Sequence, residues 1–266
     1  MLEKMEHCLN LLDIKERGKD LKFLQILQEK YLENFVFSSI NVLLNKELSL
    51  DNQLLFQRVI GNKEGGYCFE HNKIFYELLS YLGFSVKTIL ARVLNNKSVD
   101  VPKTHRLTLL SIEGKEYIID VGFGGNCPHM PIPIDEPYTN SSRGYQYRVI
   151  KEQNKYFLAR KDKGSFFTFY SFDLEEAFEA DCEMGHFYSH KHPQANFVNN
   201  LVVSRISEAA VYSLRNGSFH IIKNEDTQVV EILSQKHLQD ILKEFFSYDL
   251  DYDSCEYLFK EFCLKK

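Results

Sequence analysis

The chain has 266 residues, 44% of them hydrophobic and 26% charged, so it is long enough to bury a substantial core. Its formal net charge is −5 and no stretch concentrates lysine and arginine, so we expect no nucleic-acid partner. We also expect no membrane partner and no signal peptide, because no apolar run approaches the ~18 residues that span a bilayer and residues 1–8 are polar.

The six cysteines stand singly, without the paired spacing of a zinc ribbon or a redox motif. An even number permits disulfides, but a chain with a full core does not need them. We therefore expect free thiols and a reducing, cytoplasmic compartment, in which a cysteine nucleophile is chemically possible. The cysteines are Cys8, Cys68, Cys127, Cys182, Cys255 and Cys263.

The first third of the chain has a helical pattern. Apolar residues in 21–35 recur every three to four positions. After a glycine-rich turn, residues 68–82 place their apolar side chains on one stripe of a helix. Gly83 stands where a glycine commonly follows the end of a helix.

Strand patterns follow from residue 84 onward. Residues 126–139 interrupt them with four of the six prolines, which predicts an irregular loop. Asn216-Gly217 is a strong hairpin signal, and Ser234 is a typical N-cap for a helix that runs to Phe246. We expect another short helix in the tail, residues 251–266. The predicted strands are 85–93, 104–112, 116–121, 145–150, 155–159, 166–172, 201–206, 210–214, 218–222 and 228–233.

Cys68 follows Gly65-Gly66 and opens the predicted helix 68–82. Unpaired N–H groups and the positive end of the helix dipole favour a thiolate at such a position. The same N–H groups are candidates for an oxyanion hole that receives the oxygen of a tetrahedral intermediate. Cys68 is also a small side chain that a core can bury without any function. This segment alone does not decide between the two interpretations.

A base for Cys68 is available in the next hairpin. A two-residue turn at Glu113-Gly114 pairs residues whose numbers sum to 227, so His105 and Asp120 lie diagonally on one face. A carboxylate next to an imidazole fixes its tautomer and stabilises the imidazolium. The alternative is a His–Asp pair on a solvated face. Apolar neighbours of Asp120 argue against it, because they indicate a buried carboxylate that needs a partner.

These segments resemble the arylamine N-acetyltransferase family. The resemblance covers GGYCFEHN at 65–72, THRL at 104–107, DVGFGG at 120–125 and FYSHKHPQANFVNNLVV at 187–203, in the family's order. It implies an α+β fold with a catalytic core like that of cysteine proteases. The implied domains are a helical bundle at 1–83, a β-barrel-like domain at 84–198 and an α/β lid with a C-terminal helix at 199–266.

The resemblance also implies an activity, in which an acetyl group passes from acetyl-coenzyme A to Cys68 and then to an aromatic amine, hydrazine or N-hydroxyarylamine. By position, Cys68 is the nucleophile, His105 the acid and base, and Asp120 the orienting carboxylate. Gly124 and Gly125 would let the pantetheine arm of coenzyme A pass closely, although ending a strand is an adequate structural reason for them.

Other clusters have simpler explanations. Cys182, His186, His190 and His192 have spacings that suit zinc, but the family's loop is not a metal site and we interpret this stretch as an extended crossing before Pro193. We therefore expect no metal. His71, one turn into the helix, is expected to be structural. The aromatic residues of 166–172 are expected to form barrel core, with one or two of them lining a pocket for an aromatic acceptor.

Two positions depart from the family. Glu64 stands where the family has an arginine, and Ser38 stands where it has a glutamate. In the family these two residues form an ion pair behind the nucleophile. This chain lacks both partners, so no unpaired charge of that pair is left buried. We expect a modified support around Cys68, with Glu64 mildly unfavourable to a thiolate.

Two other functions fit the same residues. A hydrolase, a transglutaminase-like enzyme or an amide synthase could use this triad with another acyl donor, because geometry defines a triad and not its substrate. A binding protein with a relict triad is the second alternative, suggested by the altered positions 38 and 64.

Overall fold

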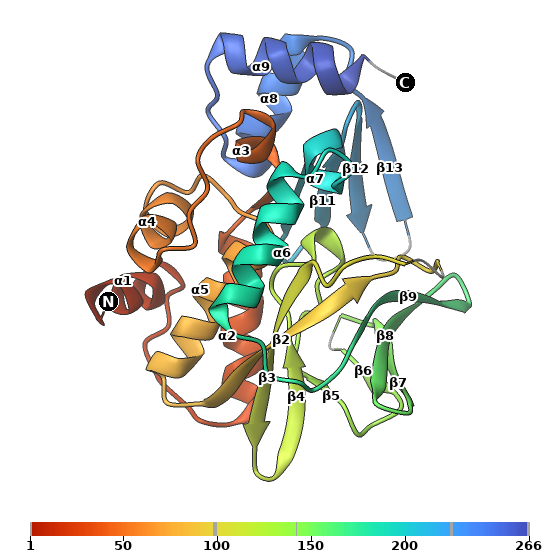
Figure 1. Ribbon diagram of the computed structural model, residues 1–266. Helices are drawn as coiled ribbons and strands as arrows, with labels where there is room; N and C mark the ends of the chain where they lie inside the picture. Colours follow the sequence, from red (N-terminus) through yellow and green to blue (C-terminus); the bar gives the residue numbers. More distant parts are fainter. Residues whose placement is uncertain (1, 98–99, 142, 224–225, 265–266) are drawn as a thin grey trace.

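The structure is a computed structural model that describes residues 2–97, 100–141, 143–223 and 226–264. It combines helices with two antiparallel sheets, which confirms the predicted α+β class (Figure 1). None of the helices in these ranges is long and apolar enough to cross a membrane. The boundaries at residues 83 and 198 stay a prediction, and residues 1 and 266 of the predicted domains lie outside the described ranges.

The N-terminal helices pack on one side of the molecule (Figure 1). Asp20 caps α2, because its side chain accepts the N–H of Phe23 at 2.8 Å. One face of α2 is buried, as its apolar spacing predicts. The helices of this part are α1 (Leu2–Leu11), α2 (Leu21–Asn34), α3 (Ile40–Leu43), α4 (Asn52–Phe56) and α5 (Cys68–Tyr81), with a π-helical turn η1 (Gln57–Gly61) between α4 and α5.

The predicted helix after the glycine turn is α5, and most of its residues are buried. It begins at Cys68, and the carboxylate of Glu70 accepts the N–H of Tyr67 at 2.9 Å. Past its end, Gly83 has a φ of +80°, a left-handed conformation that favours glycine. The buried helix therefore carries Cys68 into the interior of the protein.

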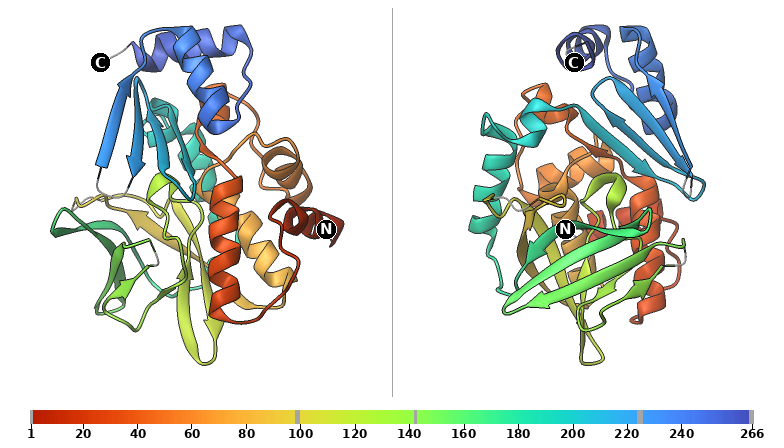
Figure 2. Two further views of the ribbon diagram at one scale, coloured as in Figure 1. Left: turned by 180° about the vertical axis from the view of Figure 1, so that it is seen from behind. Right: turned by 90° about the vertical axis from the view of Figure 1, so that its right-hand side faces the viewer.

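The larger sheet has the strand order β5-β4-β3-β2-β9-β8-β7-β6, and it curls around its own core (Figure 2). In the hairpin β3–β4, Thr108 pairs with Ile119, which is the predicted register. The pairing stops there, so His105 and Asp120 lie just beyond it. The strands are β2 (Ser85–Val93), β3 (His105–Ile112), β4 (Lys115–Ile119), β5 (Ile132–Pro133), β6 (Thr139–Asn140), β7 (Gln146–Glu152), β8 (Lys155–Asp162) and β9 (Ser165–Phe172).

The predicted loop 126–139 is irregular in part only. The 3-10 turn η2 (Gly124–Asn126) leads into it, and β5 and β6 are the two edge strands of the larger sheet, paired with β4 and β7. Within the barrel, Phe169, Tyr170 and Phe172 are buried, which confirms their expected place in the core, whereas Phe166 and Phe167 are only partly buried.

The smaller sheet has the strand order β1-β10-β11-β12-β13, so it joins the helical part of the chain to the C-terminal part. Its edge strand β1 (Phe37–Ser38) comes from the helical part, and Phe37 also forms a parallel bridge with Gly66. The segment before Cys68 is thereby tied to the C-terminal sheet. The other elements are β10 (Val202–Ile206), β11 (Val211–Arg215), β12 (Ser218–Lys223), β13 (Asp226–Glu231), α8 (Gln235–Phe246), α9 (Tyr252–Leu258) and the π-helical turn η3 (Phe259–Cys263).

The predicted N-cap of α8 and the predicted helix in the tail are confirmed. Ser234 caps α8 by accepting the N–H of His237 at 3.1 Å, and α9 is the short helix predicted in the tail, of which residues 265 and 266 lie outside the described ranges.

The predicted extended crossing before Pro193 is wrong, because helix α6 (Glu179–Lys191) occupies this stretch and α7 (Asn196–Asn199) follows. The buried residues of α6 are small or polar, which hides its helical spacing from a search for apolar periodicity. Gly185 lets α6 pack closely, since a Cβ there would lie 2.5 Å from Cζ of Phe69 and 3.0 Å from the carbonyl oxygen of Lys103.

Leu110 tests how strongly the hairpin depends on packing against the helices. It is fully buried on β3 in the core that also contains Cys68. We expect Leu110→Ala to lower the free energy of unfolding by about 2–5 kcal/mol in urea titrations. The control Leu54→Ala, at a position 61% exposed, should change it by about 0.5 kcal/mol or less. Equal losses in both variants would contradict this assignment of the core.

Candidate active site

Three segments meet at Cys68. The thiol opens α5, and its Sγ lies 3.4 Å from the carbonyl oxygen of Thr104, the residue directly before His105. On another side is Gly122, where a Cβ would lie 2.7 Å from Cα of Cys68. Only glycine leaves room for the loop after β4 to come this close. Cys68 is 3% exposed and is therefore nearly enclosed.

The surroundings of Cys68 favour the neutral thiol. Burial raises the pKa of Cys68, and the negative charge of Asp120 raises it further. The backbone N–H groups of Phe69 and Arg106 act in the opposite direction but do not outweigh burial. The N–H groups at the helix start therefore do not by themselves lower the pKa of Cys68 below its ordinary value. The thiol needs a proton acceptor beside it.

His105 and Asp120 form a buried hydrogen bond, with 2.8 Å between Nε2 and Oδ2. Burial alone would raise the pKa of Asp120, but His105, Asn72 and the N–H of Gly122 hold it below the ordinary value of 3.8. Because Asp120 is ionised, Nε2 donates the proton, and Nδ1 is left to accept one. The burial of both side chains excludes the alternative of a solvated surface pair.

Two residues that the sequence analysis missed complete the surroundings of Asp120. Asn72 donates from Nδ2 to Oδ1 of Asp120 at 2.9 Å, and its own Oδ1 accepts the N–H of Val121 at 2.9 Å. Gln28 of α2 donates to the carbonyl oxygen of Asp120 at 3.3 Å. Asn72 stands four residues after Cys68, on the same face of α5, and this spacing was a usable signal.

Aromatic rings enclose the imidazole of His105. Its ring centroid lies 5.1 Å from that of Phe123, in an edge contact, and 5.1 Å from that of Tyr170. Tyr170 is fully buried, and burial raises the pKa of its phenol well above the usual range. The neighbours of the imidazole are thus apolar or neutral, apart from Asp120.

Gly124 and Gly125 have a packing role in this structure. A Cβ on Gly124, whose φ is +65°, would lie 3.1 Å from Oγ of Ser204, and one on Gly125 would lie 3.0 Å from Cγ1 of Val211. The glycines therefore let η2 pack against β10 and β11. Their contact with coenzyme A stays a prediction.

The remaining histidines near α5 and α6 have structural partners. His71 contacts the hydroxyl of Tyr31 and the carbonyl oxygen of Val36, and burial lowers its pKa to about 4. It is thus held as a neutral structural residue. Among the residues that the structure describes, no group of three or more His, Cys, Asp or Glu side chains is arranged to hold a metal ion.

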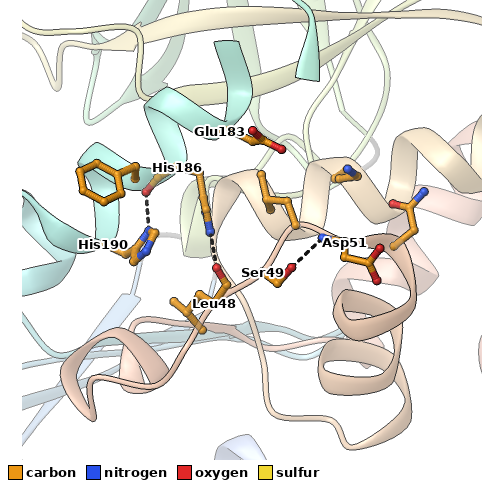
Figure 3. Close-up of a pocket in the computed structure, with 10 residues that line it drawn as sticks. Leu48, Ser49, Asp51, Glu183, His186 and His190 are labelled. Atoms are coloured by element: carbon orange, nitrogen blue, oxygen red, sulfur yellow. Dashed lines mark hydrogen bonds between the residues drawn. The ribbon is translucent and has the colours of Figure 1, made fainter. Parts of the chain in front are cut away.

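A cavity of about 610 Å³ lies between α6 and the segment that precedes α4 (Figure 3). His186 lies at its wall, between the carbonyl oxygen of Leu48 at 3.1 Å and the hydroxyl of Tyr67 at 2.6 Å. Tyr67 is the residue directly before Cys68, so this wall supports the start of α5. Cys68, His105 and Asp120 do not line this cavity.

Comparisons with known proteins give the family and the fold. The family model described as N-acetyltransferase matches residues 20–255. The chain is 34% identical over 220 residues to the arylamine N-acetyltransferase of Escherichia coli strain K12. This match covers 82% of this chain and 76% of that protein. The structure of the Salmonella typhimurium arylamine N-acetyltransferase superposes with a TM-score of 0.91 at 26% identity, covering 98% of this chain and 100% of that one.

A more distant structure shares the fold. The arylamine N-acetyltransferase of Mycobacterium marinum, solved in complex with CoA, has a TM-score of 0.91 at 21% identity. It covers 98% of this chain and 100% of that one.

His186 makes stability depend on pH. Burial lowers its pKa from 6.5 to about 4, so the unfolded chain binds a proton at pH 5 that the folded protein does not. Its contribution to stability is therefore complete above pH 6.5 and is lost as the pH falls toward 4. In urea titrations, His186→Gln should shrink the difference in unfolding free energy between pH 7 and pH 5 by about 1–2 kcal/mol.

The exposed His7 provides the control for this measurement, and His7→Gln should leave the difference between the two pH values unchanged. An unchanged difference in His186→Gln would contradict the burial of this imidazole as a neutral group.

Proposed function

Because the chain belongs to the arylamine N-acetyltransferase family, we propose that it transfers an acetyl group from acetyl-coenzyme A to an aromatic amine or hydrazine through a thioester on Cys68. The observation that carries this proposal is the buried 2.8 Å hydrogen bond between His105 and Asp120, beside the start of α5. This bond occupies Nε2 of His105, so Nδ1 is the nitrogen proposed to accept a proton, and Thr104, directly before His105, contacts the Cys68 thiol.

The first half-reaction loads the enzyme. The thiol of Cys68 gives its proton to Nδ1 of His105, and Asp120 stabilises the imidazolium that forms. The thiolate attacks the carbonyl carbon of the thioester, and backbone N–H groups at the start of α5 are the candidates for binding the oxyanion. When the tetrahedral intermediate collapses, the bond to the coenzyme A sulfur breaks and His105 returns the proton to that sulfur.

The second half-reaction unloads the enzyme. The amine nitrogen attacks the acetyl carbonyl on Cys68, and His105 takes a proton from that nitrogen. The bond between the carbonyl carbon and Sγ then breaks, the sulfur is protonated from His105, and the amide leaves. The resting thiol and the neutral imidazole are thereby restored.

The acceptor and the cytoplasmic location belong to the same proposal. The ring of Phe123 next to His105 supports an aromatic amine as acceptor, because an aromatic ring stacks favourably on another. Gly124 and Gly125 follow Asp120 closely in sequence and are the candidates for contact with the pantetheine arm. Six free cysteines support a reducing compartment.

One experiment tests the proposal against its alternatives. Stoichiometric enzyme mixed with acetyl-coenzyme A should release free thiol and gain the mass of one acetyl group, and Cys68→Ala should do neither. Fast loading from other acyl donors but not from acetyl-coenzyme A would favour a different thiol acyltransferase. An unmodified wild-type protein with every thioester would contradict an acyl-enzyme mechanism.

Asp120→Asn tests the role of the carboxylate. An amide can donate to Nε2 and so favour the wrong tautomer of His105, which should lower the rate constant of acetyl-enzyme formation by about 100- to 10,000-fold. Stopped-flow detection of released coenzyme A measures this rate. The exposed Asp162 at the end of β8 is the matched control, and Asp162→Asn should acetylate normally. A loss of less than about threefold in Asp120→Asn would contradict the role.

A further inference from the structure

The turn before Cys68 is held on one side by β1 of the smaller sheet and by the segment after α8. The carbonyl oxygen of Gly66 accepts the N–H of Ser38 in β1 at 2.7 Å. The carbonyl oxygen of Glu64 accepts a hydrogen bond from the hydroxyl of Tyr248, which follows α8. Gly65 between them has a φ of +69°, so the turn uses a backbone conformation that favours glycine.

The same turn is held from the helical side by an ion pair. Arg58, in the π-helical turn η1, pairs with one carboxylate oxygen of Glu70, whose side chain is 1% exposed. The other oxygen of Glu70 accepts the N–H of Tyr67 at 2.9 Å. Arg58 also donates from Nη1 to the carbonyl oxygen of Gly65 at 3.4 Å. Arg58 and Glu70 therefore fix the peptide groups on both sides of Gly66.

The charge of Glu70 bears directly on Cys68, two residues earlier. Burial raises the pKa of Glu70, while Arg58 and the N–H of Tyr67 oppose this and favour the carboxylate. The Glu70 charge is one of the causes that raise the pKa of Cys68. The groups that act on the pKa of Glu70 are Arg58, the N–H of Tyr67 and His190. Those that act on the pKa of Cys68 are Asp120, Glu70 and the N–H groups of Phe69 and Arg106. In the proposed mechanism, His105 also acts on Cys68.

Glu64 takes no part in this pair. Its carboxylate lies 3.4 Å from Nζ of Lys46 and accepts a hydrogen bond from Asn62 at 2.9 Å. The positions 38 and 64 thus supply backbone groups to the turn, while its ion pair comes from Arg58, whose side chain is 13% exposed, and the buried Glu70.

We propose that Arg58 and Glu70 are the positioning ion pair of this enzyme, which holds Cys68 in its attacking position. Within the pair, Arg58 offsets the negative charge of Glu70, which opposes the thiolate. Arg58 is the positively charged member, and its removal leaves a buried carboxylate without a counter-ion beside the nucleophile. The inference rests on the proposed function, because it assigns a role to the support of the same nucleophile.

The test compares Arg58→Met, Glu70→Gln and the double variant. The matched controls are Arg17→Met and Glu6→Gln, from an exposed ion pair next to the opposite end of α5, where Tyr81 contacts Glu6. Two readouts are measured: the rate constant of acetyl-enzyme formation from acetyl-coenzyme A, and the pH dependence of Cys68 alkylation by iodoacetamide, followed by mass spectrometry. Alkylation needs no acyl donor, so it separates this proposal from the proposed function.

Arg58→Met should slow acetylation at pH 7 by about tenfold or more. It should also move the alkylation profile to higher pH by at least about 0.5 unit, because the Glu70 charge is no longer offset. Glu70→Gln should move the profile to lower pH, since Arg58 is then unopposed and glutamine still accepts the Tyr67 N–H. The double variant should return the profile toward that of the wild type. Both controls should match the wild type.

Shifts in opposite directions distinguish a charge effect from a general loss of structure, and the double variant gives an answer even if one single variant does not fold. Acetylation and alkylation profiles that are unchanged in all three variants would overturn the proposal, and so would shifts of the two single variants in the same direction. A wild-type protein that forms no acetyl-enzyme would instead overturn the proposed function.

Discussion

The buried carboxylate of Asp120 is the constraint on which the candidate active site depends. It is fully buried yet ionised, and an ionised group away from water is costly unless donors surround it. Three donors do so: Nε2 of His105 at 2.8 Å, Nδ2 of Asn72 at 2.9 Å and the N–H of Gly122 at 2.9 Å. These donors come from β3, from α5 and from the loop after β4. The hydrogen bonds that stabilise the Asp120 charge therefore also hold together the three segments that meet at Cys68.

Two buried carboxylates, those of Asp120 and Glu70, raise the pKa of the Cys68 thiol. Asp120 is bonded to His105, and Glu70 is paired with Arg58. Burial is the largest cause of the raised pKa, and only 3% of the Cys68 surface is exposed. The proposed mechanism makes the thiolate only as His105 becomes an imidazolium, which Asp120 stabilises. In that mechanism, burial couples the formation of the thiolate to proton transfer, and the N–H groups at the helix start have a smaller effect.

Local patterns predicted much of this site, because the decisive relations are short in sequence. The turn at Glu113-Gly114 fixes the hairpin register, and this register brings His105 to Asp120. Relations between distant segments were not predictable in this way. Helix α6 was missed because its buried side chains are small or polar, and the pairing of β1 with β10 joins segments more than 160 residues apart. Arg58 stands in a π-helical turn, which apolar periodicity does not reveal, so its pairing with Glu70 was not predicted either.

The tautomer of His105 is the most direct test of this account. In protein with ¹⁵N-labelled histidine, NMR at neutral pH should show a His105 proton on Nε2, shifted to low field by its bond to Asp120 and protected from exchange with water, and Nδ1 without a proton. Substitution of Asp120 by asparagine should abolish this signal. A wild-type His105 that carries its proton on Nδ1, or exchanges freely between both nitrogens, would contradict the claim that Asp120 directs a basic nitrogen toward Cys68.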